Sequence, residues 1–480
     1  MQKKLYDLTN PQKSIWYTGE FFKNTPIENI LGTVILSEKV NFELLEKAIN
    51  IFVEKNDSFR LKFIIENQNV KQYVEPYSYF NIDLLEISSD EDLRTIEKDF
   101  TSNVFNVLNS FLYNFKLIKF SDGHGGFIIS IHHLISDAWS SGFGSSEIIK
   151  IYTNLLKNEN IEEISYPSYI DYITTEQDYI NSDRYKKDKA FWEDMFENIP
   201  EITTIPKTTQ NKENALDCTS NRKEFTIPKE IIDNISNFCK DKKVSIFNFF
   251  MAIYSIYISR VSGQEEFCLG TPVLNRSNIK DKHTSGMFVS TVPLKVSLKN
   301  NIPFKELTSN ISSSMFNIFK HQKYSYLSVL EDLRAKNNSN IPGLYKILIS
   351  YQNIRSSAQN KEMPFNIKWI PNGCTSDDID IHIYDMNDTG NISIAYDFQI
   401  SKYVENDINN IHNRILNLIN QVIENNTINI NELDIVTPEE KNTLLVEFNN
   451  NTLPYDASKS IKDIFENQAV LSSNKIVFVS

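Results

Sequence analysis

Residues 125–156, GGFIISIHHLISDAWSSGFGSSEIIKIYTNLL, place two adjacent histidines between an isoleucine-rich run and a periodic apolar pattern. The run follows the turn-like SDGHGG and a second apolar stretch, LYNFKLIKF at 112–120, so the two stretches together predict a β-hairpin. Apolar pairs at 148/149, 151/152 and 155/156 then predict a helix. The segment therefore predicts a strand, a loop and a helix in succession.

Two histidines and an aspartate stand at the end of the predicted strand. Because successive strand residues point to opposite faces of a sheet, His132 and His133 cannot both reach one ligand from a regular strand. Asp137 lies four residues beyond His133, in the loop, and can turn back toward the strand end. Three interpretations stay open: a hydrogen-bonded histidine with a structural role, a zinc site, and a catalytic base.

The chemistry of these side chains separates the three interpretations only in part. The pair lacks the i, i+4 helical spacing of a metal-binding motif, and no nearby cysteine or carboxylate cluster completes a coordination shell, which disfavours zinc. A neutral imidazole titrates near physiological pH and can accept a proton from an attacking amine. Structural and catalytic roles are both compatible with the residue types.

The composition is that of a large, acidic globular protein. With 480 residues the chain is too long for one core, so two or more domains are expected. A net charge of −13 argues against a general nucleic-acid-binding surface. The four cysteines are scattered without CxxC spacing, which is typical of reduced thiols in a cytoplasmic protein. The sequence contains no apolar leader and no run long enough for a membrane span, so neither is expected.

The order of predicted elements in the first half of the chain recurs in the second. The first half contains a strand, a helix, a strand, a hairpin and a helix, at 31–37, 41–56, 59–65, 112–133 and 145–158. The second half contains a strand, two helices, a hairpin and a helix, at 222–227, 229–241, 245–261, 379–398 and 404–423. Because both halves end in a hairpin and a helix, the pattern predicts two α+β lobes of related topology.

The character of the chain changes from about residue 438 onward. This part is loop-rich, with one short amphipathic stretch, IKDIFENQ at 461–468, and an apolar, strand-like end at 475–480. It is typical of a linker followed by the truncated start of another domain. The expected divisions are a first lobe at 1–178, a second lobe at 179–437 and this linker at 438–480.

The motif HHLISDAWS at 132–140 resembles the HHxxxDG signature of nonribosomal peptide synthetase condensation domains. Further stretches resemble other motifs of that family in the family's order: LTNPQKSIWYTGEFF (8–22), NDSFRLKF (56–63), YPSYIDYI (166–173), GTPVLNRS (270–277), GMFVSTVPLKV (286–296) and HQKYSYLSVLEDLR (321–334). The resemblance implies an α+β fold of two chloramphenicol-acetyltransferase-like lobes that form a V, with the active site in the tunnel between them. Ala138 replaces the glycine of the signature; because alanine is the smallest alternative, we expect an altered loop but an intact site.

The resemblance also assigns roles to the motif residues. His133 matches the second histidine of the signature and is either the base or the group that hydrogen-bonds the amine, whereas His132 is the structural candidate. Asp137 is expected to orient the site. In the family this carboxylate pairs with an arginine from the other lobe; Arg276 stands at the matching place and Arg60 is the other candidate. A buried carboxylate needs such a partner, because an unpaired one is costly.

The resemblance further suggests which residues line the substrate tunnel. These candidates are Trp139, Ser140, Gly286, Met287, Ser290 and Thr291. The alternative for the last four is a strand in the core. No permanently bound cofactor and no metal are expected; the phosphopantetheine arm of a carrier protein and a coenzyme A thioester are expected as substrates.

The position of the first motif in the chain predicts the source of the acyl group that the domain transfers. Only seven residues precede it, and several motifs also resemble starter condensation domains of lipopeptide synthetases. We therefore expect a domain that N-acylates a carrier-bound aminoacyl thioester with a fatty acyl group from acyl-CoA. Its expected partners are the peptidyl carrier protein of the same module and a downstream adenylation domain. The tail from Leu444 resembles the linker that opens such a domain, so residues 438–480 are expected to be a linker and the truncated start of an adenylation domain. The alternatives are an elongating condensation domain, which forms a peptide bond between carrier-bound substrates, and a noncatalytic carrier-docking scaffold.

Overall fold

The computed structural model describes residues 3–207, 216–299, 301–353, 363–385, 391–450 and 456–473, and the structural statements below concern these residues. It divides into two compact units, residues 1–435 and 436–480. The first unit contains both predicted lobes. The tip of the predicted hairpin at 386–390 and the apolar end at 475–480 lie outside the described residues.

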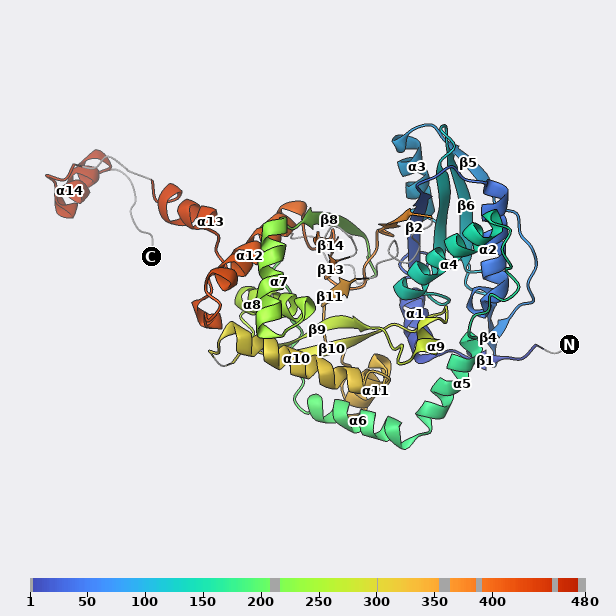
Figure 1. The fold of residues 1–480 in the computed structure, drawn as a ribbon. Coiled ribbons are helices and arrows are strands. Elements are labelled where there is room, and N and C mark those ends of the chain that lie inside the picture. Colours follow the sequence, from blue (N-terminus) through green and yellow to red (C-terminus); the bar gives the residue numbers. More distant parts are fainter. Residues whose placement is uncertain are drawn as a thin grey trace. The chain divides into compact units, whose positions relative to one another are not determined.

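The first lobe is built on a five-stranded sheet with the strand order β12-β2-β7-β6-β5. Figure 1 labels β2, β5 and β6 of this sheet. Its strands are β2 (Asn29–Leu36), β5 (Leu84–Ile87), β6 (Tyr113–Phe120), β7 (Gly125–His132) and β12 (Phe365–Ile370). A smaller sheet has the order β1-β4-β3, with β1 (Tyr6–Asp7), β3 (Leu61–Glu66) and β4 (Asn69–Val74). The lobe's helices are α1 (Asn10–Phe21), α2 (Phe42–Lys55), η1 (Asp57–Arg60), α3 (Asp90–Thr101) and α4 (Ala138–Leu156).

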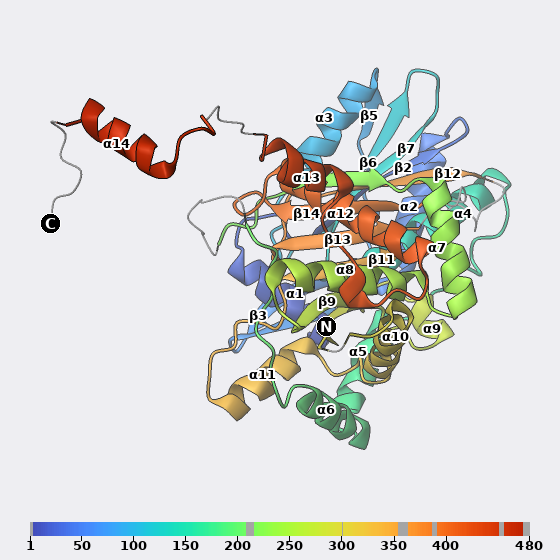
Figure 2. The same ribbon diagram turned by 90° about the vertical axis from the view of Figure 1, so that its left-hand side faces the viewer.

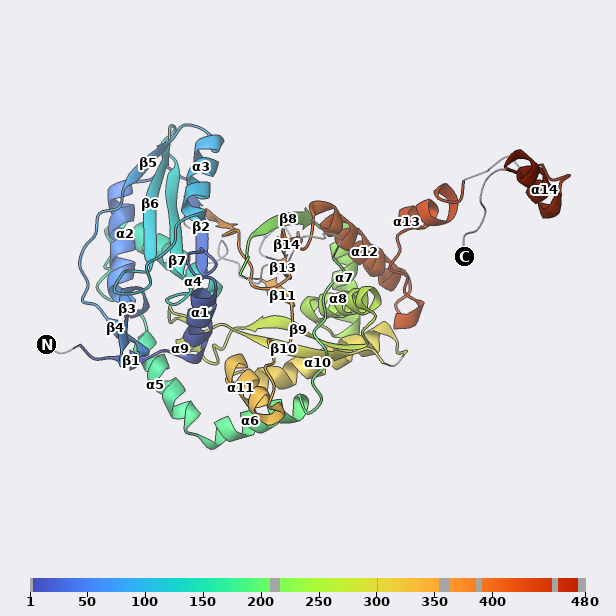
Figure 3. The ribbon, with the colours of Figure 1, turned by 180° about the vertical axis from the view of Figure 1, so that it is seen from behind.

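The apolar run that opens the motif forms β7, which is buried along its whole length. Phe127 and Ile129 belong to the core cluster that also contains residues of α2 and α4. Ile128, on the opposite face, packs in a second cluster with Phe100 of α3. Helices therefore cover both faces of this sheet (Figure 3), which explains why the strand lacks polar alternation. The predicted hairpin of β6 and β7 is confirmed by its antiparallel pairing.

The second lobe is built on a six-stranded sheet with the order β10-β9-β11-β13-β14-β8. Its strands are β8 (Ser220–Thr226), β9 (Glu266–Val273), β10 (Ser290–Ser297), β11 (Ile347–Gln352), β13 (Ile379–Tyr384) and β14 (Ser393–Gln399). The helices after the motif are α5 (Tyr169–Ile180), α6 (Asp183–Met195), α7 (Lys229–Lys242), α8 (Ile246–Ser262), α9 (Ile279–Lys282), α10 (Phe304–Lys320), α11 (Tyr326–Asn337), α12 (Glu405–Glu424) and η3 (Ile430–Glu432). The predicted hairpin of β13 and β14 and the helix after it are confirmed.

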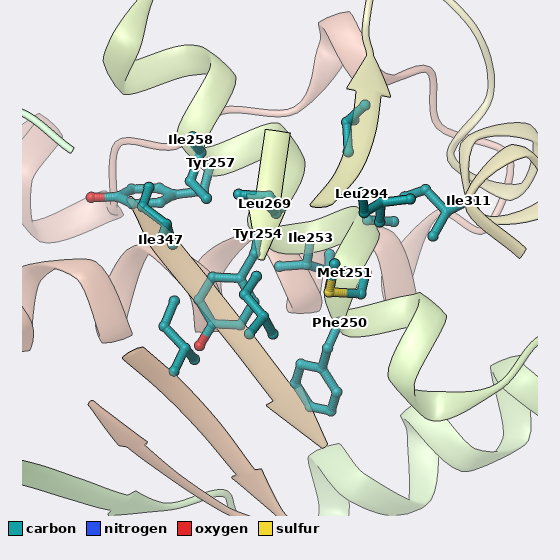
Figure 4. Packing of buried hydrophobic residues seen from close by; sticks show 14 of the residues in the cluster. Phe250, Met251, Ile253, Tyr254, Tyr257, Ile258, Leu269, Leu294, Ile311 and Ile347 are labelled. Carbon is teal, nitrogen blue, oxygen red and sulfur yellow. The ribbon is translucent and has the colours of Figure 1, made fainter. Parts of the chain in front are cut away.

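Helix α8 lies against the second lobe's sheet (Figure 2) and supplies much of that lobe's core (Figure 4). Ten successive residues of this helix, Phe249–Ile258, are buried. Its side chains pack with Leu269 of β9, Leu294 of β10 and Ile347 of β11 (Figure 4). A helix that is apolar on all sides is expected only where protein surrounds it, and this burial is consistent with that rule.

Strand β12 belongs to the first lobe's sheet, although its residues fall in the range expected for the second lobe. It pairs antiparallel with β2, from Phe365 opposite Leu36 to Ile370 opposite Leu31. Just after it, the Asn372 side-chain amide donates to the carbonyls of Ile27 and Asn29, at 2.9 and 3.1 Å. The two lobes therefore share a strand, which ties them together through backbone hydrogen bonds.

The second unit contains α13 (Pro438–Asn442), the π-helical turn η4 (Thr443–Glu447) and α14 (Ile461–Leu471). The predicted amphipathic stretch is confirmed as α14, but part of the expected loop is helical, because Thr437 caps α13 through the backbone N–H of Glu440. None of the helices in the described ranges combines the length and the apolar character of a membrane span on its own; α7 and α8 do so only as a pair bent by 105°.

Candidate active site

The histidine motif lies where β7 gives way to α4. Strand β7 ends at His132, His133 begins a tight turn, and α4 begins at Ala138. The helix starts seven residues earlier than the apolar pairs predicted, because the Asp137 side chain caps it by accepting from the Ser140 backbone N–H at 2.8 Å. The signature's aspartate is therefore a helix cap as well as a charged group.

His133 is half-buried and is fixed in one orientation. Its backbone N–H donates to the Glu28 carbonyl at 2.8 Å, and its Nδ1 lies 3.2 Å from the Ser136 carbonyl. Since a carbonyl oxygen only accepts hydrogen bonds, Nδ1 must carry the proton and Nε2 keeps its lone pair. Burial lowers the pKa of His133, against the opposing charge of Asp137, so the neutral ring is favoured at neutral pH.

His132 has a different environment. It is buried, its Nδ1 accepts the Leu134 backbone N–H at 3.1 Å, and its ring meets Phe105 edge-on. Burial, together with the neighbouring His133, lowers its pKa to about 3. One nitrogen is used by the turn and the ring packs against an aromatic residue, as a structural role requires; that role stays a prediction.

Asp137 is fully buried and lies against Arg276, which comes from the second lobe. Arg276 Nη1 donates to Asp137 Oδ2 at 2.7 Å, and both side chains are completely inaccessible to solvent. The same oxygen accepts the backbone N–H groups of Phe288 and Val289, at 3.0 and 3.2 Å. Burial alone would raise the pKa of Asp137, but the charge of Arg276 and these hydrogen bonds hold it below its ordinary value.

Ser140 and Gly286 extend this contact between the lobes. Ser140 Oγ donates to the Gly286 carbonyl at 2.8 Å, and it accepts the Gly286 backbone N–H and Arg276 Nη2 at 3.0 and 2.6 Å. Gly286 has φ of +150°, and a Cβ there would lie 2.1 Å from the Tyr169 ring. Only glycine fits this close approach. Ser140 and Gly286, two of the six predicted tunnel residues, are thus part of the buried contact between Asp137 and Arg276.

The other predicted tunnel residues are placed around this contact. Trp139 is half-buried, and its indole N–H donates to the Lys282 carbonyl at 3.0 Å. Met287 is buried, and its carbonyl accepts the Tyr169 hydroxyl at 2.7 Å. Ser290 and Thr291 begin β10, opposite β9, and are half-buried. The tunnel role of these residues stays a prediction.

Of the two arginine candidates, Arg60 does not contact Asp137. It lies in η1 of the first lobe, and its Nη1 donates to the Glu75 carbonyl at 3.1 Å.

The structure also explains why alanine is tolerated at position 138. Ala138 is exposed and is the first residue of α4, where helical backbone angles suit any small residue. The glycine of the signature is therefore not required by the backbone at this position.

Sequence reasoning missed two features of the site. Glu28 is 7% exposed, burial raises its pKa to about 8, and its carbonyl holds the His133 backbone. Phe288 lies under the Arg276 guanidinium, whose carbon is 4.1 Å from the ring centre. The sequence contains no local signal for Glu28; the apolar GMFV stretch next to the predicted arginine segment was the available hint for Phe288.

The arrangement can perform proton transfer at a partly accessible, neutral imidazole. His133 supplies a lone pair, and the buried ion pair of Asp137 and Arg276 fixes the turn that follows it. Among the residues that the structure describes, no group of three or more histidine, cysteine, aspartate or glutamate side chains is placed to hold a metal ion.

Two α+β lobes meet at the histidine–aspartate motif, where Arg276 of the second lobe pairs with Asp137 of the first. Residues 2–445 match the family model described as "Condensation domain", and the chain belongs to that family. It is 30% identical over 483 residues to surfactin synthase subunit 1 of Bacillus subtilis (strain 168), covering 99% of this chain. It is 24% identical to the dimodular nonribosomal peptide synthase of the same organism, again over 99% of this chain. It spans 13% and 20% of the lengths of these two relatives.

Solved structures confirm the fold class. The starter condensation domain of rhizomide synthetase, in complex with C8-CoA and Leu-SNAC, matches with a TM-score of 0.78 at 17% identity, covering 90% of this chain and 97% of that one. The first condensation domain of the calcium-dependent antibiotic synthetase matches with a TM-score of 0.78 at 14% identity, covering 90% and 99%. The chain is a condensation domain by its family match, and condensation domains of nonribosomal peptide synthetases catalyse amide-bond formation.

Proposed function

We propose that this domain is a starter condensation domain, which transfers a fatty acyl group from acyl-CoA to the amine of a carrier-bound aminoacyl thioester. The acceptor is held on the phosphopantetheine arm of the peptidyl carrier protein of the same module, and an adenylation domain downstream loads it. No permanently bound cofactor takes part.

The observation that carries the proposal is the fixed, neutral imidazole of His133. Its Nδ1–H is held by the Ser136 carbonyl, so Nε2 keeps its lone pair, and in this proposal the amine approaches that atom. As the amine nitrogen attacks the thioester carbonyl, Nε2 accepts the proton that the amine loses. The tetrahedral intermediate then collapses, the C–S bond breaks, and the departing thiolate takes the proton from His133. The same lone pair orients the amine by a hydrogen bond before the attack.

Asp137 acts at a distance from the reacting atoms in this proposal. Its carboxylate is used entirely by Arg276 and backbone N–H groups, so it is a positioning residue that fixes the turn carrying His133. An ion pair that joins two lobes also fixes their contact next to the histidine. Holding the reacting groups within a fraction of an ångström of the productive geometry is a large part of the catalytic effect.

The proposal that acyl-CoA is the donor is supported by a solved structure of the same fold. A domain of the same fold, the rhizomide synthetase starter condensation domain, was solved with C8-CoA and with Leu-SNAC. The starter role also agrees with the resemblance of several motifs. An elongating domain with a peptidyl-carrier donor is the alternative that the experiment must exclude.

The test is the intact mass of an aminoacyl carrier protein after incubation with acyl-CoAs from acetyl-CoA to palmitoyl-CoA, with no second carrier present. We expect a mass increase equal to the acyl group. The apparent affinity for the donor should rise with chain length by up to roughly 0.8 kcal/mol per buried CH₂ until the pocket is filled. The His133→Ala variant is the control for background transfer. Absence of product with every acyl-CoA, together with turnover of a peptidyl-carrier donor, would establish the elongating alternative instead.

A further inference from the structure

Two of the four cysteines come together in the fold. Cys218 precedes β8 of the second lobe. Cys374 lies in residues 371–378, the crossing segment, which runs from β12 in the first lobe's sheet to β13 in the second lobe's sheet. Cys218 is 3% exposed, whereas Cys374 is half-buried. No role has been assigned to either residue, and their separation in the sequence gives no sign that they are neighbours.

An antiparallel bridge joins the backbones around the two cysteines. Thr219 pairs with Cys374, and the Thr375 backbone N–H donates to the Cys218 carbonyl at 2.8 Å. Opposite residues in such a bridge hold their Cα atoms about 4.5 Å apart. Because Cys218 is next to Thr219, its Cα atom lies roughly 6 Å from that of Cys374. Disulfide bonds span about 4.4–6.8 Å between Cα atoms, so the backbone separation suits one.

The two thiols are neighbours as well. Burial raises the pKa of Cys374 to about 12, and interaction with the Cys218 thiol adds to this rise. A regular ladder would send these two side chains to opposite faces of the sheet. The pairing here is a single bridge beside a turn at Gly373, which has φ of +77°, so the regular alternation does not apply. Both the backbone and the thiols are therefore placed for a disulfide bond.

The crossing segment is hydrogen-bonded to the strand beside the histidine motif. The Cys374 backbone N–H donates to Asn372 Oδ1 at 2.9 Å. The Nδ2 of the same side chain donates to the carbonyls of Ile27 and Asn29. Between these two residues lies the one whose carbonyl accepts the His133 backbone N–H. A bond that restrains Cys374 would therefore restrain the segment that holds the strand next to His133.

We propose that Cys218 and Cys374 form an intramolecular disulfide when the protein meets an oxidising small-molecule disulfide, such as glutathione disulfide, and that this bond restrains the crossing segment beside the motif. Cys374 is the more exposed thiol, so its thiolate attacks glutathione disulfide first; one glutathione thiolate leaves, and a mixed disulfide remains. The Cys218 thiolate then attacks the Cys374 sulfur and releases the second glutathione. The two protein thiols lose two electrons and two protons, which leave with the two glutathione thiols.

The reaction is expected to be slow at neutral pH. Only the thiolate attacks, and the raised pKa of Cys374 leaves little of it, with Cys218 and Asp217 adding to the effect of burial. Below that pKa the thiolate fraction rises about tenfold with each pH unit, so oxidation should accelerate as the pH rises. The pair thus responds to sustained oxidation rather than to a brief exposure.

The test is incubation of the unaltered protein with glutathione disulfide at alkaline pH, followed by alkylation of free thiols in denaturant and mass spectrometry. The reduced protein has four thiols to alkylate, and the oxidised protein should have two. Peptide mapping should place the bond between Cys218 and Cys374, and dithiothreitol should restore all four thiols. Four free thiols after prolonged incubation, or a bond that involves Cys239 or Cys268, overturn the proposal.

Single substitutions supply the controls. Cys218→Ala and Cys374→Ala should each remain without an intramolecular disulfide. Cys239→Ala, the matched control in α7, should form the bond as the unaltered protein does. Loss of the bond in Cys239→Ala would overturn the assignment of the pair.

Hydrogen exchange tests the link to the motif. The bond should slow amide exchange in the crossing segment and at residues 27–29 of the oxidised protein, and dithiothreitol should reverse the change. Unchanged exchange at these amides overturns the proposed restraint. The inference does not depend on the acyl donor, so a failure of acyl-CoA turnover would refute the proposed function and leave this result intact.

Discussion

Replacing Arg276 with alanine should destabilise the protein by about 3–5 kcal/mol, the usual cost of removing one partner from a buried ion pair. Both side chains of the Asp137–Arg276 pair are 0% exposed, so water cannot solvate the charge that is left behind. Asp137→Ala should cost at least as much. It also removes the acceptor of the backbone N–H groups of Ser140, Phe288 and Val289. Each buried donor without a partner adds about 1–3 kcal/mol.

The assay is urea unfolding followed by circular dichroism, applied to both single variants and the double variant. The double variant should lose less than the sum of the single losses, with a coupling toward the upper end of about 0.5–3 kcal/mol. Arg222 and Asp397, paired in the second lobe at 2.6 Å, are the matched control. Their substitutions should couple to each other and be additive with Asp137→Ala.

The pH dependence of the same variants supplies an independent check. The folded pKa of Asp137 is below its ordinary value of 3.8, so the folded state binds this proton less readily than the unfolded chain. The stabilisation is therefore complete above about pH 3.8 and is lost as the pH falls through the lower, folded pKa. Additive losses, or a cost of less than about 1 kcal/mol for Arg276→Ala, would refute the reasoning. Coupling of Asp137 to Arg60 instead would reassign the pair.

Three further predictions concern single residues. His133→Ala should lower the rate of amide formation by about 10²- to 10⁴-fold with an unchanged circular dichroism spectrum, and near-normal turnover would exclude the proposed role. His132→Ala should lower the free energy of unfolding, and by less in acid than at neutral pH. The pKa of His132 is about 3 in the folded protein and 6.5 ordinarily, so its stabilisation is complete above pH 6.5 and is lost as the pH falls toward 3. If the urea midpoint of the variant fell with acid as steeply as that of the unaltered protein, this argument would be contradicted. Gly286→Ala should destabilise the protein, because the new Cβ would clash with the Tyr169 ring. Gly19→Ala is the control: its Cβ would meet only the Glu28 side chain at 4.0 Å, so it should be neutral or stabilising by up to about 1 kcal/mol. Thermal unfolding compares the two variants, and equal midpoints would disprove the steric argument.

The sequence predicts the elements of the site well because their signals are local. The isoleucine run before the histidines forms β7, the periodic pattern after them forms α4, and the two apolar runs of the second half form the hairpin of β13 and β14. Each signal is a pattern of apolar residues within one element, so it can be read from the sequence without knowing the element's partners in the fold. The order of the motifs was enough to identify the family.

Capping and close packing were harder to predict. The start of α4 at Ala138 depends on the Asp137 side chain accepting from Ser140, and its early turns contain the small residues Gly142 and Gly144. A Cβ at Gly144 would lie 2.9 Å from Phe52 of α2. Small residues in sequence indicate a loop as readily as a tightly packed helix, so only the neighbouring helix decides between them.

The contacts between distant segments were decided by the tertiary structure alone. Resemblance placed Arg276 at the matching position and left Arg60 as the other candidate for the partner of Asp137. The fold pairs Asp137 with Arg276, 139 residues away, by bringing the segment before α9 against the start of α4. Strand β12 joins β2 across more than half of the chain, and Glu28 comes to hold the His133 backbone, with no sequence signal for either. The physical reason is that periodicity and capping act within a few residues of chain, whereas strand partners and buried ion pairs are chosen by which surfaces meet once the lobes have folded.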